Sequence, residues 1–240
     1  MFPLYFTGLG NRKNNQDFYL SVATGDDLLI GVADGVGGNR GGDIASKLAV
    51  RTFTKNFLQL IRSSAVKEAL EASFHIAHEA IIEQSEQKIE YSSMATTLSV
   101  AYILKNKIYV AHSGDSRVYL LRGNGIKQLT EDQTEVNMFL KEGLISAKDA
   151  ETYHRKNIIV NALGIKSDFD VQIEEFGLED LDRIVLLTDG FYESVSKSEF
   201  RNLSVEEKEF SNFLFNTIQL CKTRKPNDNY TIVGVEYSTD

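Results

Sequence analysis

Aspartates stand at the ends of five apolar runs in this 240-residue chain: Asp17 before FYLSV, Asp34 after LLIGVA, Asp115 after IYVAHSG, Asp189 after RIVLLT, and Asp228 just before YTIVGVEY. Short runs of this composition predict β-strands. A strand fixes the position of a side chain at its end, so neighbouring strands would gather these carboxylates at one place. A single Asp-Gly pair is also a common turn, and for any one of these sites both interpretations stand.

The order of the other elements predicts the fold class. Strands are expected over 18–22 and 28–33, and two helices with apolar stripes are expected after them. The stripe of the first helix is Ile44, Leu48, Phe53, Phe57 and Ile61. The stripe of the second helix is Val66, Leu70, Phe74, Ala77 and Ile81. A meander follows, in which TTLSVAYIL turns at Asn106-Lys107 into IYVAHSG, and RVYLLR turns into IKQLT. Close spacing implies antiparallel pairing. Strands with helix pairs inserted between them indicate an α+β architecture rather than a βαβ array.

Two capping boxes are predicted toward the C-terminus. Ser146 with Asp149 marks a short helix, and Ser204 with Glu207 marks the start of the last helix. The stripe of that last helix is Phe210, Phe213, Leu214, Ile218 and Cys221. The one cysteine excludes an intrachain disulfide and is expected to be buried as a small apolar residue.

Charge and hydropathy narrow the classes of function. The net charge is −8, and no basic run stands out, which argues against binding to a nucleic-acid backbone. No window approaches the ~20 apolar residues of a membrane span. The N-terminus lacks the basic and apolar regions of a secretory signal. We therefore expect a cytoplasmic protein without a membrane or nucleic-acid partner.

The carboxylates indicate a hard divalent cation. Like charges held together raise one another's pKa unless a cation neutralises them, and oxygen ligands favour Mg²⁺ or Mn²⁺. His75 and His78 lie on a predicted helix without an accompanying HExxH pattern and are expected to face solvent, whereas His112 is expected to be packed or hydrogen-bonded in a strand. Zinc is not expected.

A set of motifs in a fixed order resembles the metal-dependent protein phosphatases of the 2C type, in their compact bacterial form. These motifs are Arg12-x-x-Asn15-Gln16-Asp17, VADGVGG, Gly42-x-x-Ala45-Ser46, Thr96-Thr97-Leu98, Gly114-Asp115-Ser116-Arg117, Leu129-Thr130-x-Asp132, Ala162-Leu163-Gly164, Leu187-Thr188-Asp189-Gly190 and Asp228-Asn229. Each motif alone is weak, but the ordered set covers essentially the whole chain. The resemblance implies one catalytic domain over 1–240, with a flap at about 134–165.

The implied fold is a sandwich of two antiparallel sheets with helices on both outer faces and a metal pair at one end. By this resemblance Asp34 bridges two Mn²⁺ or Mg²⁺ ions and the Gly35 carbonyl binds one of them, where a glycine lets the backbone approach closely. Asp189 and Asp228 would hold the first ion, and Asp17 would act mainly through metal-bound water. Asp115 would help to hold a third, weaker ion, with Glu193 as a further candidate.

The implied activity is hydrolysis of phosphoserine and phosphothreonine in proteins by a water that bridges the two ions, with Asp34 and Arg12 as the catalytic residues. Arg12 would hold the phosphate oxygens, because a guanidinium matches them bidentately. Phosphorylated proteins and a cognate Ser/Thr kinase are the expected partners of a monomeric enzyme.

This chain departs from the family pattern at several positions. Gln16 replaces a common Glu and drops a charge. Val36 stands where eukaryotic members carry a histidine proposed as general acid, and a valine cannot donate a proton. Gln133 replaces a frequent His, Glu193 a frequent Asp, and Ala95 a frequent Gly. Two rival functions stay open: a non-catalytic regulatory or scaffolding domain, which the retained Asp34, Asp189 and Asp228 disfavour, and a nuclease, which the acidic surface disfavours.

Overall fold

Two antiparallel sheets form the centre of the molecule, in a computed structural model that describes residues 1–36, 41–166 and 169–239. The loop predicted at Gly37 and Gly38 lies outside the described residues. One sheet has the order β1-β11-β10-β7-β8, with the bounds Leu4–Gly8, Tyr230–Glu236, Arg183–Leu187, Arg117–Arg122 and Gly125–Gln128. The other has the order β2-β3-β5-β6-β9, with the bounds Asp17–Thr24, Asp27–Val36, Leu98–Leu104, Lys107–Ser113 and Gln172–Gly177, and the short β4 (Ala95–Thr96) pairs with β3.

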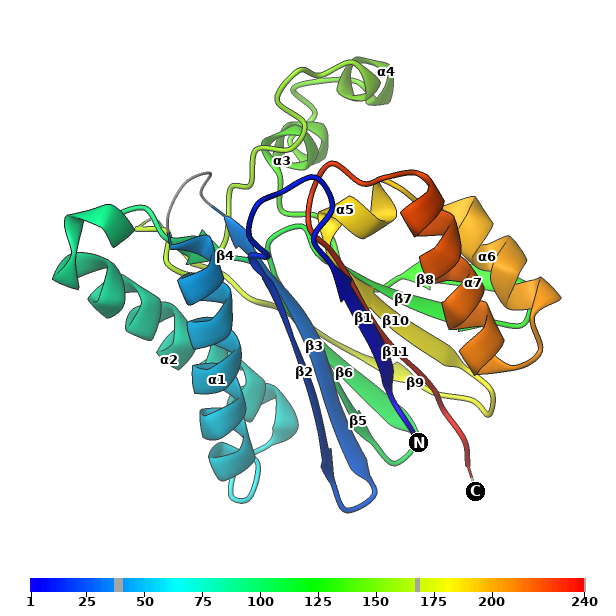
Figure 1. The fold of residues 1–240 in the computed structure, drawn as a ribbon. Coiled ribbons are helices and arrows are strands. Elements are labelled where there is room, and N and C mark those ends of the chain that lie inside the picture. Colours follow the sequence, from blue (N-terminus) through cyan, green and yellow to red (C-terminus); the bar gives the residue numbers. More distant parts are fainter. Residues whose placement is uncertain (37–40, 167–168, 240) are drawn as a thin grey trace.

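Helices cover both outer faces of this sandwich (Figure 1). The six-stranded sheet is covered by α1 (Gly42–Leu60) and α2 (Val66–Gln87), which a short 3-10 helix follows at Ile89–Tyr91. The five-stranded sheet is covered by α6 (Lys197–Glu206) and α7 (Phe210–Thr223). Two short helices, α3 (Glu135–Lys141) and α4 (Ala147–Glu151), project from one end, and α5 (Asp189–Tyr192) lies below them. The predicted α+β sandwich is confirmed.

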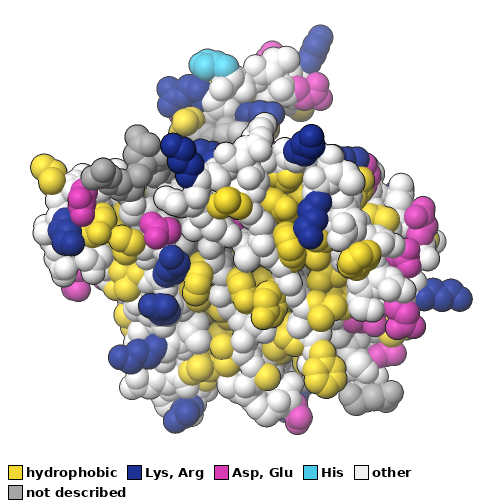
Figure 2. All heavy atoms as spheres, in the orientation of Figure 1, with side chains coloured by type: hydrophobic (Ala, Val, Ile, Leu, Met, Phe, Trp, Pro, Cys, Tyr) yellow, Lys and Arg dark blue, Asp and Glu magenta, His cyan; other side chains and the backbone are white. Residues whose placement is uncertain are grey.

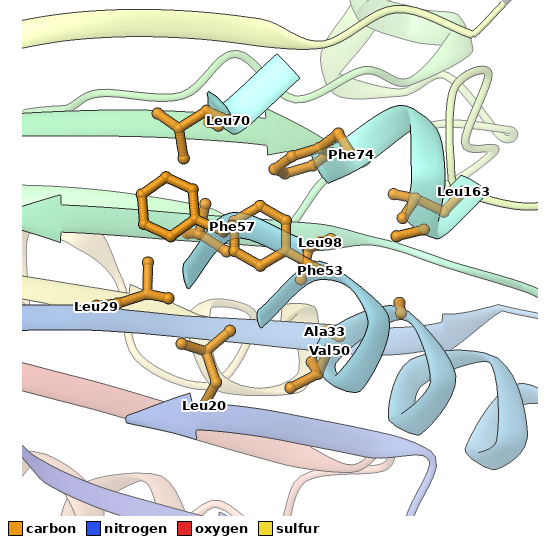
Figure 3. Close-up of a cluster of buried hydrophobic side chains, with 14 of the residues drawn as sticks. Leu20, Leu29, Ala33, Val50, Phe53, Phe57, Leu70, Phe74, Leu98 and Leu163 are labelled. Atoms are coloured by element: carbon orange, nitrogen blue, oxygen red, sulfur yellow. The ribbon is translucent and has the colours of Figure 1, made fainter. Parts of the chain in front are cut away.

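Strand alternation divides the core into layers. In β3, Leu29 and Ala33 face the helices α1 and α2, whereas Ile30 and Val32 face the second sheet, because successive side chains of a strand point to opposite faces. Figure 3 shows the helix layer, where Phe53 lies 5.6 Å from Phe57 and 5.2 Å from Phe74 between ring centroids. A third cluster fills the space between the five-stranded sheet and α5 to α7 and includes the buried Cys221. Among the described residues no helix is long and apolar enough to cross a membrane.

The strands differ from the prediction in four details. β3 continues through Asp34 to Val36, so Asp34 lies inside a strand and not in the loop after it. The hairpin turn between β5 and β6 is at Lys105-Asn106, one residue earlier than predicted, and Lys105 has a φ of 54°. The strands β6 and β7 do not pair, since they belong to different sheets. The strands β1 and β9 were not predicted, because their half-exposed residues lack a long apolar run.

Two of the helix-based predictions were wrong. Ser204 lies within α6, whose capping box is Ser196 with Glu199, and α7 begins at Phe210 without a side-chain cap. His78 is buried rather than solvent-facing: its Nδ1 accepts a hydrogen bond from the Gly164 amide, and its ring stacks on Phe169 at 4.2 Å. The predicted capping box at Ser146 is confirmed.

Candidate metal-dependent active site

Both sheets contribute aspartates to one end of the sandwich, below α3 and α4 in Figure 1. Asp17 is the first residue of β2 and lies opposite Asp34 of β3 in the strand register. Asp189 begins α5, directly after β10, and Asp228 precedes β11. Asp34 interacts electrostatically with all of the other aspartates of the set, which are Asp17, Asp189, Asp115 and Asp228. The structure therefore brings together the five aspartates that the sequence singled out.

Burial and mutual repulsion make these carboxyl groups hard to ionise. Burial raises the pKa of Asp17 to about 7, and two hydroxyl hydrogen bonds partly oppose that shift. Burial likewise raises the pKa of Asp115 to about 7 and that of Asp189 to about 6. Burial and then the charges of its neighbours hold the pKa of Asp34 well above the ordinary range of an aspartate. Such a set of carboxylates needs a compensating cation to be fully ionised at neutral pH.

Two oxygens at this end of the sandwich are free to bind a cation. Oδ1 of Asp17 and Oδ1 of Asp189 are buried and accept no hydrogen bond from any described residue. A buried unpaired carboxylate oxygen costs free energy unless a ligand satisfies it. The donors are all oxygens, which suits Mg²⁺ or Mn²⁺. Within the described residues, however, no three His, Cys, Asp or Glu side chains lie together closely enough to hold a metal ion. The residues thus fit divalent ions in chemistry, although their side chains do not enclose one.

The backbone of Asp34 is fixed by threonines of the neighbouring hairpin. The Asp34 amide donates to Thr97 Oγ1 at 2.9 Å, and its carbonyl accepts from the Thr97 amide and from Thr96 Oγ1. The next residue, Gly35, packs against the first turn of α1: a Cβ there would lie 2.3 Å from the Gly42 carbonyl oxygen. Glycine is therefore required at position 35 by the close approach of α1 to β3, independently of any bound ion.

Arg12 forms a bidentate ion pair with Asp228. Its Nε donates to Asp228 Oδ1 at 2.8 Å, and its Nη2 donates to Oδ2. The segment that carries Arg12 is held by Asn229, whose Nδ2 donates to the Leu9 and Asn14 carbonyls and whose Oδ1 accepts from the Gln16 amide. The Arg12 side chain is 52% exposed. The guanidinium thus lies at the solvent edge of the aspartate cluster.

Asp115 is buried beside a stacked pair of side chains. The Tyr192 hydroxyl lies 3.4 Å from Asp115 Oδ2, and the Arg117 guanidinium stacks on the Tyr192 ring at 3.7 Å. Arg117 is itself paired with Asp132, its Nη2 donating to Oδ2 at 2.6 Å. Glu193, the candidate ligand of a third ion, is exposed and accepts a hydrogen bond from Asn157 of the flap. Glu193 therefore contacts the flap in this structure.

Gln133 connects both ends of the flap to the loop that carries Asp115. Its Oε1 accepts from the Gly114 amide and from Asn161 Nδ2, and its amide donates to the Gly114 carbonyl at 2.7 Å. Its carbonyl accepts from the Val160 amide at 2.9 Å. The segment between Gln133 and Asn161, which forms most of the predicted flap, is thereby joined at its base by one side chain and its peptide groups.

Several residues at this end were not identified as site residues from the sequence. Asn229 orders the Arg12 segment, Tyr192 contacts Asp115, and Thr188 and Thr231 donate hydrogen bonds to Asp17. Each lies next to, or within three residues of, a predicted ligand in the chain. Proximity in the motifs was therefore the available signal, but the partner of each hydroxyl depends on how the two sheets pack.

Comparison with known proteins identifies the family. A family model described as protein phosphatase 2C matches residues 9–229. The chain is 32% identical over 232 residues to the serine/threonine phosphatase Stp of Listeria welshimeri, which covers 95% of this chain and 88% of that protein. The chain belongs to the protein phosphatase 2C family.

Solved structures share the fold. The serine/threonine phosphatase of S. agalactiae superposes with a TM-score of 0.89 at 28% identity, covering 99% of this chain and 100% of that one. The catalytic domain of the serine/threonine protein phosphatase PstP, in complex with two manganese ions, superposes with a TM-score of 0.82 at 26% identity, covering 99% and 98%. The sandwich and its layers are thus those of bacterial serine/threonine phosphatases.

Proposed function

We propose that this protein is a metal-dependent phosphatase that hydrolyses phosphoserine and phosphothreonine in proteins. The observation that carries the proposal is the cluster of aspartates from both sheets, with raised pKa values and two unpaired buried oxygens, in a chain of the protein phosphatase 2C family. Asp34, Asp189, Asp228 and the Gly35 carbonyl would hold two Mn²⁺ or Mg²⁺ ions, with Asp17 beside them and Asp115 and Glu193 toward a third. Such ions supply a lowered pKa for water and neutralise charge on the phosphoryl group.

The chain's own residues bind and orient the substrate. Arg12 is half-exposed beside Asp228, where its planar guanidinium can donate two parallel hydrogen bonds to a phosphate. Lys and Arg side chains also lie around the upper end of the face in Figure 2, where they complement an anionic phosphopeptide. Val36 offers no proton to the leaving serine or threonine oxygen, so that proton comes from solvent. The products are the free hydroxyl side chain and inorganic phosphate.

The test of this function is release of inorganic phosphate from a phosphothreonine peptide. Turnover is expected with Mn²⁺ or Mg²⁺ and is expected to vanish with excess EDTA and return on re-addition of metal. A non-hydrolysable phosphonate analogue of the same peptide and a single-stranded DNA serve as controls for binding and for nuclease activity. Absence of turnover by folded, metal-loaded protein would refute the proposal and favour a regulatory or scaffolding domain.

Replacement of Arg12 by Ala is expected to lower kcat/KM about 10- to 100-fold, because hydrogen bonds to a charged group are worth about 1.5–3 kcal/mol. Mn²⁺ affinity should stay equal or increase, since Asp228 loses its competing ion pair. Steady-state kinetics and calorimetric Mn²⁺ titration measure the two effects. The exposed Arg62, at the far end of α1, provides the control variant Arg62→Ala. Unchanged kcat/KM in Arg12→Ala would remove Arg12 from phosphate binding.

The proposal extends to the domain organisation, the partners and the location of the protein. The match to the family over 9–229 supports one catalytic domain for residues 1–240, with the flap at 134–165. A protein phosphatase requires phosphorylated proteins as substrates, and a Ser/Thr kinase that forms them is the expected counterpart. We place the enzyme in the cytoplasm as a monomer, in keeping with its acidic composition. Size-exclusion chromatography with light scattering tests the monomer.

A further inference from the structure

Two buried hydroxyl groups hold the carboxylate of Asp17 from the opposite sheet. Thr188 Oγ1 donates to Asp17 Oδ2 at 2.8 Å, and Thr231 Oγ1 donates to the same oxygen at 2.7 Å. Both threonines are fully buried, and Asp17 is 5% exposed. Asp17 lies on β2 of the six-stranded sheet, whereas Thr231 lies on β11 and Thr188 directly after β10 of the five-stranded sheet. The contact therefore crosses the interface between the sheets.

The direction of each hydrogen bond follows from its other partners. Thr188 Oγ1 accepts from the Thr231 amide at 2.9 Å, so its own proton is available for Asp17. When Asp17 is ionised, as a metal ligand must be, its carboxylate can only accept, so the single hydroxyl proton of Thr231 goes to Asp17. The 2.9 Å contact between the Thr231 and Thr7 hydroxyls then uses the Thr7 proton, and Thr7 Oγ1 accepts from Asn15 Nδ2 at 2.7 Å. Both threonines are thus arranged as donors to the carboxylate.

The two carboxylate oxygens of Asp17 differ in their hydrogen-bond partners. Oδ2 has two hydroxyl donors, whereas Oδ1 is buried and has no partner among the described residues. The neighbouring charges that act on Asp17 include Asp34, Asp189 and Asp228, which are proposed ligands. A rotation that moved Oδ2 away would leave both hydroxyl protons without their acceptor in a buried place, which is unfavourable. The hydroxyls therefore lock the carboxylate in one orientation.

We infer that Thr188 and Thr231 are positioning residues for the metal centre, which fix Asp17 so that Oδ1 is its one oxygen available to the ions or their waters. This inference rests on the proposed function only for the identity of the ions. Partners that orient a ligand from behind it are worth about 10- to 100-fold in metal affinity. The identity of positions 188 and 231 as hydroxyl residues is explained by this role, because valine would fill the same volume.

The test compares valine and serine at each position. Metal-free protein is titrated calorimetrically with Mn²⁺, without substrate. Thr188→Val and Thr231→Val are expected to weaken Mn²⁺ binding about 10-fold or more, whereas Thr188→Ser and Thr231→Ser, which keep the hydroxyl, stay within about 3-fold of wild type. Thr217→Val is the matched control: Thr217 is also fully buried and donates to the Phe213 carbonyl inside α7, away from the aspartates. Its Mn²⁺ affinity should equal that of wild type.

The results of these titrations distinguish a positioning role of the two threonines from a purely structural role. They also test that role independently of the proposed phosphatase activity. Valine variants that bind Mn²⁺ as wild type does, or serine variants that bind as weakly as valine variants, would overturn the inference. Thermal denaturation in EDTA shows whether each variant is folded. If a valine variant does not fold, the serine and alanine variants at that position are titrated, and equal weakening in both overturns it. Because the readout is Mn²⁺ binding, a wild type that bound Mn²⁺ but released no phosphate would refute the proposed function alone.

Discussion

Asp34→Asn is expected to abolish phosphate release and, at the same time, to raise the melting temperature of the metal-free protein. Loss of the proposed bridging carboxylate should lower kcat/KM by at least about 10³-fold, which corresponds to about 4 kcal/mol of transition-state stabilisation. In EDTA the same change removes a charge that burial and four neighbouring aspartates disfavour. Each kcal/mol gained raises the melting temperature of a protein of this size by about 2–4 °C.

Because the activity is expected to fall while the melting temperature rises, unfolding of the variant cannot explain the result. A variant that lost activity by unfolding would melt at a lower temperature. Asp26→Asn is the control, since Asp26 is exposed in the turn at the other end of the same β2–β3 hairpin. It should change neither quantity. If Asp34→Asn melted below wild type in EDTA at pH 8, Asp34 would contribute to stability and the charge-repulsion argument would be wrong; retained activity would exclude Asp34 from catalysis.

The stability of the metal-free protein is expected to fall as the pH rises from 6.5 to 8. The pKa values of Asp17 and Asp115 are raised from 3.8 to about 7 by burial, so the folded state binds more protons than the unfolded state until both groups ionise. A raised folded-state pKa gives stability that is present at low pH and is lost as the pH passes through that value. The loss amounts to about 1 kcal/mol for each of the two groups over this interval.

The pH interval from 6.5 to 8, and the comparison of EDTA with Mn²⁺, distinguish the effect of the carboxylates from that of other titrating groups. Burial lowers the pKa of His112 to about 4, so His112 destabilises the fold as the pH falls toward and below 6.5, which opposes the effect of the carboxylates in this interval. Chemical denaturation in EDTA at pH 6.5 and 8 measures the effect, and Asp115→Asn should reduce it by about 1 kcal/mol, the share of that group. Saturating Mn²⁺ is expected to abolish this slope, because the metal-bound carboxylates are ionised at both pH values, as they are in the unfolded chain. Equal stability at both pH values in EDTA would contradict the raised pKa values.

The layers of the fold could be predicted because hydrophobic periodicity is local. The stripe through Leu70, Phe74 and Ile81 predicted the buried face of α2, and the run YTIVGVEY predicted β11. The prediction of a capping box at Ser204 was wrong because the same sequence pattern occurs at Ser196, where the α6 helix begins. The prediction that His78 faces solvent was wrong because its hydrogen-bond partner, the Gly164 amide, is 86 residues away in the chain. Contacts set by tertiary packing leave little trace in local sequence.

The site could be predicted only as a set of residue types. Aspartates at strand ends indicated a shared metal centre, and the structure places Asp17 opposite Asp34 as that idea requires. The ion pair of Arg12 with Asp228 and the hydroxyls that hold Asp17 could not be predicted, because they join segments more than 170 residues apart. The metal assignments of the individual aspartates stay predictions, of which Asp34→Asn tests the bridging role.

The Gln133 junction makes the flap a separable part of the molecule. Between β8, which ends at Gln128, and β9, which begins at Gln172, the chain forms the segment with α3 and α4, and Gln133 and Val160 on either side of these helices are hydrogen-bonded to each other. A loop whose ends are pinned together can change in length or sequence at little cost to the rest of the fold. Residues 134–159 can therefore be exchanged for the corresponding segment of another family member without moving the aspartates. Selection of substrates can diverge in this way among related enzymes while their chemistry stays fixed.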